Sequence, residues 1–286
     1  MSSQTTEIIL YTKPVGIPIE YSVMTVKTYA PYFVGRETCT HKRLARNYSS
    51  ARYMGHKRHA ALGYYIPDIF YGEDGRAYPE ALQQWLLNDW IDLEETVRGR
   101  LESRDSYLIS MGQKPLEKQQ QNRQLTTAKM EVGIVTATYS AWKAWFKLRC
   151  ASDADRAMQE VANSIRTQMV ESTPVESNFH APYADSLVTT LEEYEKACTY
   201  TPARLARVSA ARPGPGQRGE EELMNSLKEK THISPFEHNC LWIAVPYKSA
   251  LNSKKSDRYF PYGSISSSNY HFGWQNLRSE MEYGNE

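Results

Sequence analysis

The 286-residue chain has few of the features that mark secreted, membrane or disulfide-linked proteins. Its four cysteines, Cys39, Cys150, Cys198 and Cys240, are scattered and form no CxxC pair, which predicts free thiols in a reducing cytoplasm. No charged lead precedes a long apolar core near the N-terminus, and no apolar run is long enough to span a membrane. We therefore expect a soluble, cytoplasmic protein with no membrane partner.

The common motifs of nucleotide and nucleophile sites are also missing. There is no GxGxxG, no GxxxxGK[ST] and no GxSxG, so any cofactor must be held by a site of another design. His56 and His59 are three residues apart, but Lys57 and Arg58 lie between them and would repel a dication. Solvated or phosphate-facing histidines are favoured here, and we expect no metal.

Charge is balanced over the whole chain but not locally. The chain has 34 Lys and Arg against 33 Asp and Glu, which disfavours a general polyanion binder and predicts no nucleic-acid partner. Residues 40–59 nevertheless hold six Lys or Arg, and no carboxylate lies between Glu37 and Asp68. Within this stretch, "NYSSARY" offers hydroxyls and the guanidinium of Arg52 to a phosphate, with tyrosines beside them for a base. On composition alone, a solvated basic face and a phosphate site are equally open.

Residue periodicity predicts both strands and helices. Residues 21–37 are rich in Val, Thr, Tyr and Phe, which indicates a strand, a turn and the start of a helix. Residues 78–108 predict a helix with Pro79 in its first turn. Residues 126–149 are more apolar and predict a buried helix that ends at Arg149.

The remaining elements are predicted from caps and composition. Ser152 and Asp155 have the spacing of a capping box at the start of a helix over residues 152–170. Its buried face should hold Ala154, Met158, Val161, Ile165 and Met169. Residues 211–222, rich in Gly and Pro, predict a loop, and residues 249–286 an irregular tail. We expect one domain over residues 1–286.

Two stretches resemble the signature regions of flavin-dependent thymidylate synthases. "THISPFEHNCLWIAV" (231–245) is similar to the family's H-x-[ST]-P-F-E-H segment, which enters a strand. "APYFVGRETCTHKRLARNYSSARY" (30–53) resembles its R-H-R-x7-S motif, written here as Thr-His-Lys, seven residues and then Ser50. Weaker similarities lie at 203–212, to an R-x-x-R-V-S segment, and at 145–166, to a helix–Leu-Arg–helix region. The four segments occur in a rotated order, so the resemblance implies a circular permutation of the family fold.

The resemblance implies a fold and a reaction. The fold class is α/β (mixed α+β), with a central sheet flanked by helices, assembled as a homotetramer with shared active sites. The reaction implied is C5 methylation of UMP or dUMP, with methylenetetrahydrofolate as carbon donor, NADPH as reductant and FAD as cofactor. Two other classes stay open: a non-catalytic nucleotide-binding relative, and a single-stranded nucleic-acid binder, which would leave "SPFEH" unexplained.

The resemblance also implies roles for individual residues. Ser50 and Arg149 match catalytic positions, and Arg149 would stabilise charge that develops on the uracil ring. The nucleotide contacts implied are Ser50, Ala51, Arg52, Arg123, Arg149, Glu37 and Tyr48. The flavin contacts implied are His41, Lys42, Arg43, Ser209, His232, Ser234 and Glu237.

Several positions depart from the family pattern. Thr40 and Lys42 stand where the family has arginines, which removes forked hydrogen bonds. Glu37 replaces a glutamine, and Tyr48 replaces a glutamate. On the flavin side the differing positions are Ser140, Ala144 and Asp153. Because some of the changes surround the sugar and base, we expect a pocket not tuned to deoxyribose alone, as in a UMP/dUMP methylase of nucleoside-antibiotic biosynthesis. A dUMP-specific thymidylate synthase is the alternative.

Overall fold

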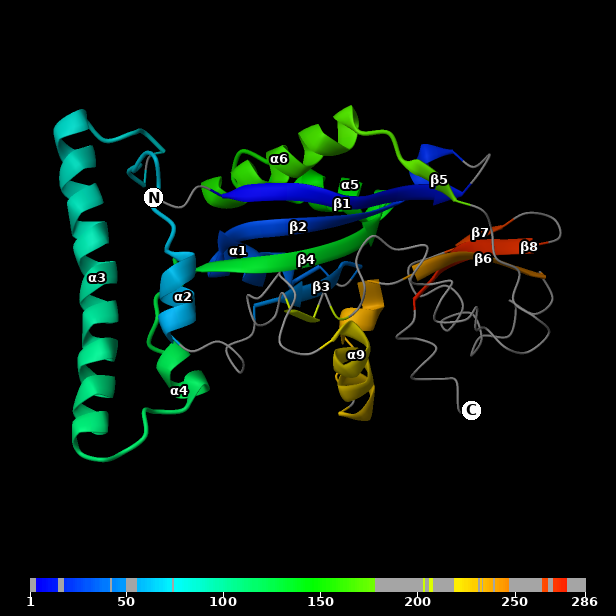
Figure 1. Ribbon diagram of the computed structural model, residues 1–286. Helices are drawn as coiled ribbons and strands as arrows, with labels where there is room; N and C mark the ends of the chain where they lie inside the picture. The colour runs from blue at the N-terminus through cyan, green and yellow to red at the C-terminus, as the bar shows by residue number, and fades with distance from the viewer. Residues whose placement is uncertain are drawn as a thin grey trace.

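A mixed sheet of five strands forms the centre of the molecule, in the order β3-β4-β2-β1-β5 (Figure 1). The structure is a computed structural model. It describes residues 4–14, 18–41, 43–49, 56–73, 75–177, 203, 206–207, 219–230, 232, 234–238, 240–246, 264–266 and 270–276. The first four strands pair antiparallel, and β5 runs parallel to β1. The strands are β1 (Thr5–Pro14), β2 (Val23–Pro31), β3 (Ala45–Tyr48), β4 (Met130–Thr138) and β5 (Val175–Ser177).

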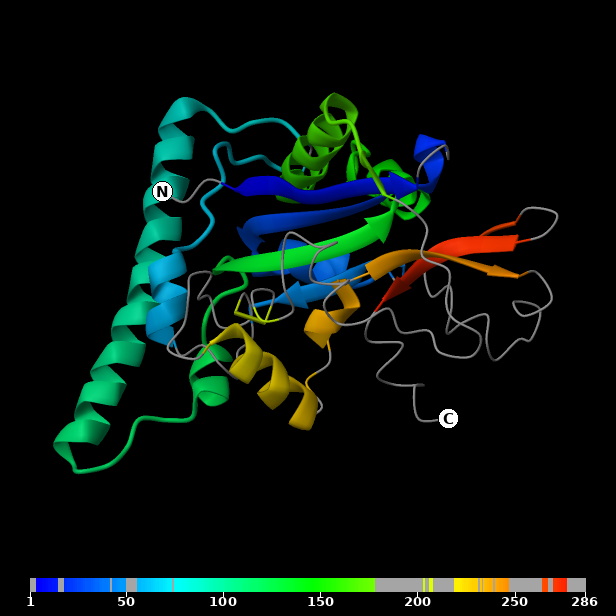
Figure 2. The same ribbon diagram turned by 45° about the vertical axis from the view of Figure 1, so that its right-hand side comes forward.

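Two helices cover one face of this sheet. α5 (Tyr139–Arg149) and α6 (Arg156–Glu171) lie on the same side of it in Figures 1 and 2. Side chains alternate along a strand, so Val135 faces these helices while Thr136 faces the opposite side. Each large apolar side chain buried here contributes about 2–3 kcal/mol. The core includes Met24, Val26, Val135, Ala137, Trp142, Trp145, Phe146, Met158, Val161, Ile165 and Met169.

The other elements surround the sheet. Helix α3 stands at one end of it and runs across the strand direction, and a second, three-stranded sheet lies toward the other end (Figures 1 and 2). The remaining helices are α1 (Tyr32–Thr38), α2 (His56–Leu62), α3 (Glu80–Ser110), α4 (Lys118–Asn122) and α9 (Glu220–Glu229). The short 3-10 helices are η1 (Ile19–Tyr21) and η2 (Ser234–His238), and the second sheet contains β6 (Cys240–Pro246), β7 (Ser264–Ser266) and β8 (Tyr270–Asn276).

The predicted helix over residues 126–149 was wrong in its first half. Residues 130–138 form β4, which pairs with β2 on one side and β3 on the other. A strand in the middle of a sheet is buried on both faces and has a continuous apolar run, which periodicity does not separate from a buried helix. The helix begins after Thr138, whose Oγ1 accepts a hydrogen bond from the backbone N–H of Ala141, and ends at Arg149 as expected.

Most other boundaries agree with expectation, with local differences. α3 starts directly after Pro79, and β2 runs into α1 without a turn. α6 is capped by Asp155, which accepts from the N–H of Met158, so the capping role expected of Ser152 was wrong. Ala154 precedes the helix, and the other four residues of the expected stripe are buried.

The C-terminal third also differs from expectation. The predicted irregular tail contains strands β7 and β8, which pair with each other, and β8 also pairs with β6. Residues 220–222, placed at the end of a loop, begin α9, and residues 211–218 lie outside the described residues. Among the helices that the structure describes, none is long and apolar enough to cross a membrane.

Candidate functional site

A cluster of polar groups forms where the end of α5 meets the end of α1. Arg149 is the last residue of α5, and its Nη1 lies 2.7 Å from Oε2 of Glu37. Its Nε donates to Nε2 of His41 at 3.2 Å. Its Nη2 contacts Oγ1 of Thr40 at 3.3 Å and the carbonyl oxygen of Glu37 at 3.5 Å. One turn of chain therefore supplies four acceptors around one partly buried guanidinium.

His41 is neutral in this cluster. Burial lowers the pKa of His41 below its ordinary value, and the guanidinium charges of Arg149 and Arg46 lower it further. A neutral imidazole can accept at Nε2, as the contact with Arg149 requires. The two guanidinium groups then outnumber the single carboxylate of Glu37, which suits the cluster to an anion.

Arg46 of β3 fastens this strand to the end of α1. Its Nη1 donates to the carbonyl oxygens of Thr38, Cys39 and His41, the last at 3.0 Å. Carbonyls at a helix C-terminus have no partner within the helix and attract cations. The arginine therefore fixes the turn that carries Thr40 and His41 relative to the sheet.

Ser49 fixes the chain just before the predicted phosphate-binding serine. Its hydroxyl donates to the carbonyl oxygen of Val132 at 3.1 Å and accepts from the N–H of Val132 at 3.0 Å. Its own N–H donates to the same carbonyl at 2.9 Å. Ser50, Ala51 and Arg52 follow outside the described residues, so their nucleotide contacts stay predictions.

The "SPFEH" segment forms η2, which packs against β3. His238 is 2% exposed, and its Nδ1 lies 2.9 Å from Oγ1 of Thr136, which in turn lies 2.7 Å from Oγ1 of Thr25. Burial lowers the pKa of His238 to about 3, so this side chain is neutral at physiological pH. Phe236 is fully buried beside it. The two signature segments, far apart in the sequence, therefore meet at β3.

The other predicted flavin contacts are only partly described. His232 is partly buried, and its backbone N–H donates to the carbonyl oxygen of Leu227 at 2.8 Å. Ser234 and Glu237 are described by their place in η2, and Arg43 is exposed. Lys42 and Ser209 lie outside the described residues.

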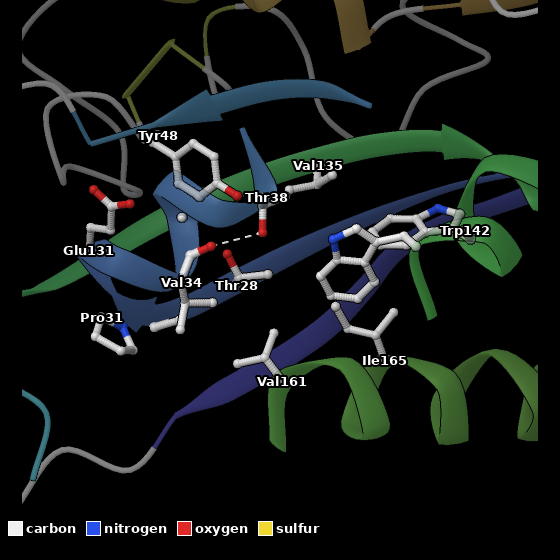
Figure 3. A pocket seen from close by; sticks show the side chains of 13 residues that line it. Thr28, Pro31, Val34, Thr38, Tyr48, Glu131, Val135, Trp142, Val161 and Ile165 are labelled. Atoms are coloured by element: carbon white, nitrogen blue, oxygen red, sulfur yellow. Dashed lines mark hydrogen bonds between the residues drawn. The ribbon is translucent and has the colours of Figure 1, made fainter. Parts of the chain in front are cut away.

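Two predicted nucleotide residues, Arg123 and Tyr48, are not among the groups that contact Arg149. Arg123 is exposed just after α4, which packs against α2. Tyr48 lies with its ring in a cavity between α1 and β4 (Figure 3). The hydroxyl of Tyr48 hydrogen bonds with the side chain of Thr38, and burial raises the pKa of Tyr48 well above its ordinary value.

Sequence reasoning did not single out Glu131, which lies in the same cavity (Figure 3). It is 4% exposed. The available signal was a lone carboxylate within the apolar run "MEVGIVTAT". Among the described residues there is no group of three or more His, Cys, Asp or Glu side chains placed to hold a metal ion.

The fold is a mixed sheet whose edge strand β3 lies beside the Arg149 cluster. Comparison with protein families identifies the protein further: the family described as "Thymidylate synthase complementing protein" matches residues 7–175. The chain therefore belongs to this family, that of the flavin-dependent thymidylate synthases, and is a thymidylate synthase-like methyltransferase. The matched residues include the Thr-His-Lys and Leu-Arg segments, while the Arg-Val-Ser and "SPFEH" segments lie beyond them.

Two solved structures are similar in fold. One is the UMP/dUMP methylase PolB from Streptomyces cacaoi bound with 5-Br dUMP, at 16% identity and a TM-score of 0.49, covering 59% of this chain and 91% of that one. The other is the same methylase bound with 5-Br UMP, at 18% identity and a TM-score of 0.46, covering 60% and 90%. No curated protein matches the chain significantly.

Proposed function

We propose that this protein methylates C5 of a uridine 5'-monophosphate, with methylenetetrahydrofolate as carbon donor and NADPH as reductant. One observation carries the proposal: the Arg149 cluster and the "SPFEH" segment are both anchored on β3, although they are far apart in the sequence. A bound FAD would supply the hydride chemistry, and His41, His232 and η2 would hold it. Free thiols at Cys39 and Cys150 are compatible with a cytoplasmic location.

Arg149 would bind and polarise the nucleotide. A guanidinium has five N–H donors in a fixed fork, and the contacts with Glu37, His41 and Thr40 use four of them. The remaining donor, held in place by the other four, can point at a nucleotide oxygen without further ordering. The role needs no protein nucleophile.

The sugar side of the cluster favours a substrate range that includes UMP. Glu37 and Thr40 present a carboxylate and a hydroxyl where the resemblance places a glutamine and an arginine. A carboxylate accepts a hydrogen bond from a ribose 2'-hydroxyl, a group that dUMP lacks. We therefore propose that UMP and dUMP are both accepted, as nucleoside-antibiotic biosynthesis would require.

We also propose that copies of the chain assemble, as a homotetramer with shared sites, through α3. Positions 82, 85, 89, 93, 96, 100, 103 and 107 are spaced by three or four residues and share one face of this helix. Large apolar side chains on that face are exposed, at 47% for Leu82, 60% for Trp85, 57% for Leu93 and 64% for Tyr107. The other four positions of this stripe are the polar residues Asp89, Thr96, Arg100 and Ser103. Exposed large apolar side chains among polar ones are typical of an interaction surface.

The stripe is self-complementary in an antiparallel pair of α3 helices. Pairing about a midpoint between residues 94 and 95 places Asp89 of each copy opposite Arg100 of the other, and Leu82 opposite Tyr107. A twofold interface repeats each such contact, so one favourable pair counts twice. Arg123 does not contact Arg149 of its own chain. In a shared site it would contact the nucleotide bound to another copy.

Product analysis tests the proposed reaction. Purified protein is incubated with methylenetetrahydrofolate, FAD, NADPH and either UMP or dUMP, and methylated nucleotide is measured. We expect product from both; product from dUMP alone would contradict the UMP assignment, and product from neither would leave a nucleotide-binding relative.

Arg149→Ala tests the site. We expect it to lower turnover by about 100-fold or more, because transition-state charge loses its donor, while flavin absorbance is retained. The exposed Arg166→Ala on α6 is the control and should keep activity. Loss of flavin from Arg149→Ala would show that Arg149 binds the flavin and not the nucleotide.

A further inference from the structure

Glu131 is a buried carboxyl group to which the proposed reaction gives no role. It belongs to β4, on the same face as Val135, and so points toward the helical side of the sheet. It lines one cavity with Tyr48, Thr28 and Thr38, and the side chains of Trp142 and Ile165 lie toward the other end of this cavity (Figure 3). Burial of an ionised carboxylate costs much free energy, so burial favours the neutral form of this group.

What Glu131 touches is the backbone of α1. A Cβ added to Gly35 would collide with Oε1 of Glu131 and lie 3.2 Å from Cε1 of Tyr48. Because Gly35 has no side chain, the carboxyl group of Glu131 and the ring of Tyr48 can lie against the helix. Glu131 and Tyr48 together set how closely α1 approaches the sheet.

Tyr48 is held in turn by a second glycine. Gly133 is its cross-strand partner, and a Cβ there would collide with the ring and lie 2.8 Å from Oγ1 of Thr28. On its other side the hydroxyl of Tyr48 bonds with Thr38, the last residue of α1. The ring is thus fixed between the strand and the helix.

The charges that face Glu131 come from two elements. Lys129, just before β4, and Arg36 of α1 attract its carboxylate, and both cations also stack on the ring of Tyr32, each 4.6 Å from its centroid. The ring of Tyr48 lies beside it, with the hydroxyl turned toward Thr38, and the α5 and α6 side chains that line the cavity are apolar. Burial raises the pKa of Glu131 to about 8, although Lys129 and Arg36 oppose the rise. Burial also lowers the pKa of Lys129.

We propose that Glu131 is a positioning residue that, in its neutral form, holds α1 in the orientation that the nucleotide site needs. α1 carries Glu37 and leads into Thr40 and His41, the groups that hold Arg149. An ionised carboxylate gains from moving toward Lys129, Arg36 and water, and such a move removes its contact with Gly35. Loss of this contact at alkaline pH releases α1 and weakens nucleotide binding.

The first test is the pH profile of Glu131→Gln, which keeps the shape of a neutral glutamic acid. This test rests on the proposed function, since it measures kcat and KM for UMP. We expect the wild type to lose kcat/KM about tenfold per pH unit above about pH 8, mainly through KM, and Glu131→Gln to lack this loss. Glu131→Asp, which can still ionise, should keep an alkaline loss.

Glu94→Gln is the matched control, because Glu94 is equally buried but lies on α3, where it accepts a hydrogen bond from Thr126. It should keep the alkaline loss of the wild type. An alkaline loss in Glu131→Gln that equals that of the wild type would overturn the proposal.

The second test needs no activity, so it separates this inference from the proposed reaction. Infrared spectroscopy of the protein alone detects the carbonyl stretch of a protonated carboxylic acid. We expect a band that disappears with a midpoint near pH 8 in the wild type and is missing in Glu131→Gln, with a parallel change in the fluorescence of Trp142 and Trp145, which line the cavity. A wild-type protein without such a band would overturn the inference even if it methylated both nucleotides. The band in a protein that methylates neither nucleotide would support the buried acid and reject only the reaction.

Discussion

Helices α1 and α3 differ in where their side chains find partners. α1 has seven residues, and within one chain its buried side packs on β4 while its end is tied to Arg149 and Arg46. α3 has 31 residues, yet one face of it exposes large apolar side chains, Trp85 and Leu93 among them. The side chains of α1 find their partners within the chain, whereas α3 carries the face through which we propose that copies of the chain associate.

The difference shows that helix length says little about how tightly a helix is constrained. A side chain added at Gly35 of α1 collides with Glu131 and comes close to Tyr48, so one of these groups must shift. A side chain added at Gly99 of α3 meets open space within the single chain. The same substitution in the two helices should therefore change the free energy of unfolding by different amounts or with opposite sign.

The largest contrast is expected for alanine in place of glycine in each helix. Gly35→Ala should destabilise the protein by about 1–3 kcal/mol, because its Cβ collides with Glu131. Gly99→Ala in α3 meets nothing within 4 Å and should stabilise by about 0.5–1 kcal/mol through helix propensity. Urea unfolding at neutral pH measures both; shifts of the same sign would contradict the contrast.

The next effect is a pH dependence of stability that arises beside α1. The pKa of Glu131 is about 8 in the folded protein, above the ordinary value of 4.5, so folding favours the protonated form. The contribution of Glu131 to the free energy of unfolding is fully present below about pH 4.5. It falls as pH rises to about 8, by up to about 1.4 kcal/mol per pH unit. Glu131→Gln should therefore be more stable than the wild type near pH 8 and similar to it in acid.

Denaturant midpoints measured across this pH range, with Glu94→Gln on α3 as control, check the prediction. Curves for wild type and Glu131→Gln that stay parallel from acid to about pH 8 would show that folding does not raise the pKa of Glu131.

The smallest effect is expected for charge exchange on the outer face of α3. Asp89→Arg should weaken self-association by about tenfold, roughly 1.4 kcal/mol, since it faces Arg100 of the other copy with a like charge. The double change Asp89→Arg with Arg100→Asp should restore it. Light scattering against concentration measures the association, with the exposed Glu102→Lys, off the stripe, as control. A double variant no better than Asp89→Arg would exclude the antiparallel pairing.

Parts of the site followed from short motifs. "SPFEH" and the Leu-Arg step at the end of a helix were recognisable because each is a contiguous run of residues. The family match covers the Leu-Arg step. The amphipathic stripe of α6 was equally clear, since a helix buried on one face repeats every three or four residues. Contact of Arg149 with His41 and Glu37 could not be read in this way, because it joins positions more than 100 residues apart.

The sequence by itself determined the local features: where α5 ends, which face of α6 is apolar, and which signature residues the chain carries. Only the tertiary structure decided that residues 130–138 form a strand, since pairing with β2 and β3 buries both faces. It also decided that Tyr48 lies inside the protein and that Glu131 lies against α1. The physical reason is that periodicity reports which neighbours a residue has along the chain, whereas the pKa of a carboxyl group depends on its neighbours in space.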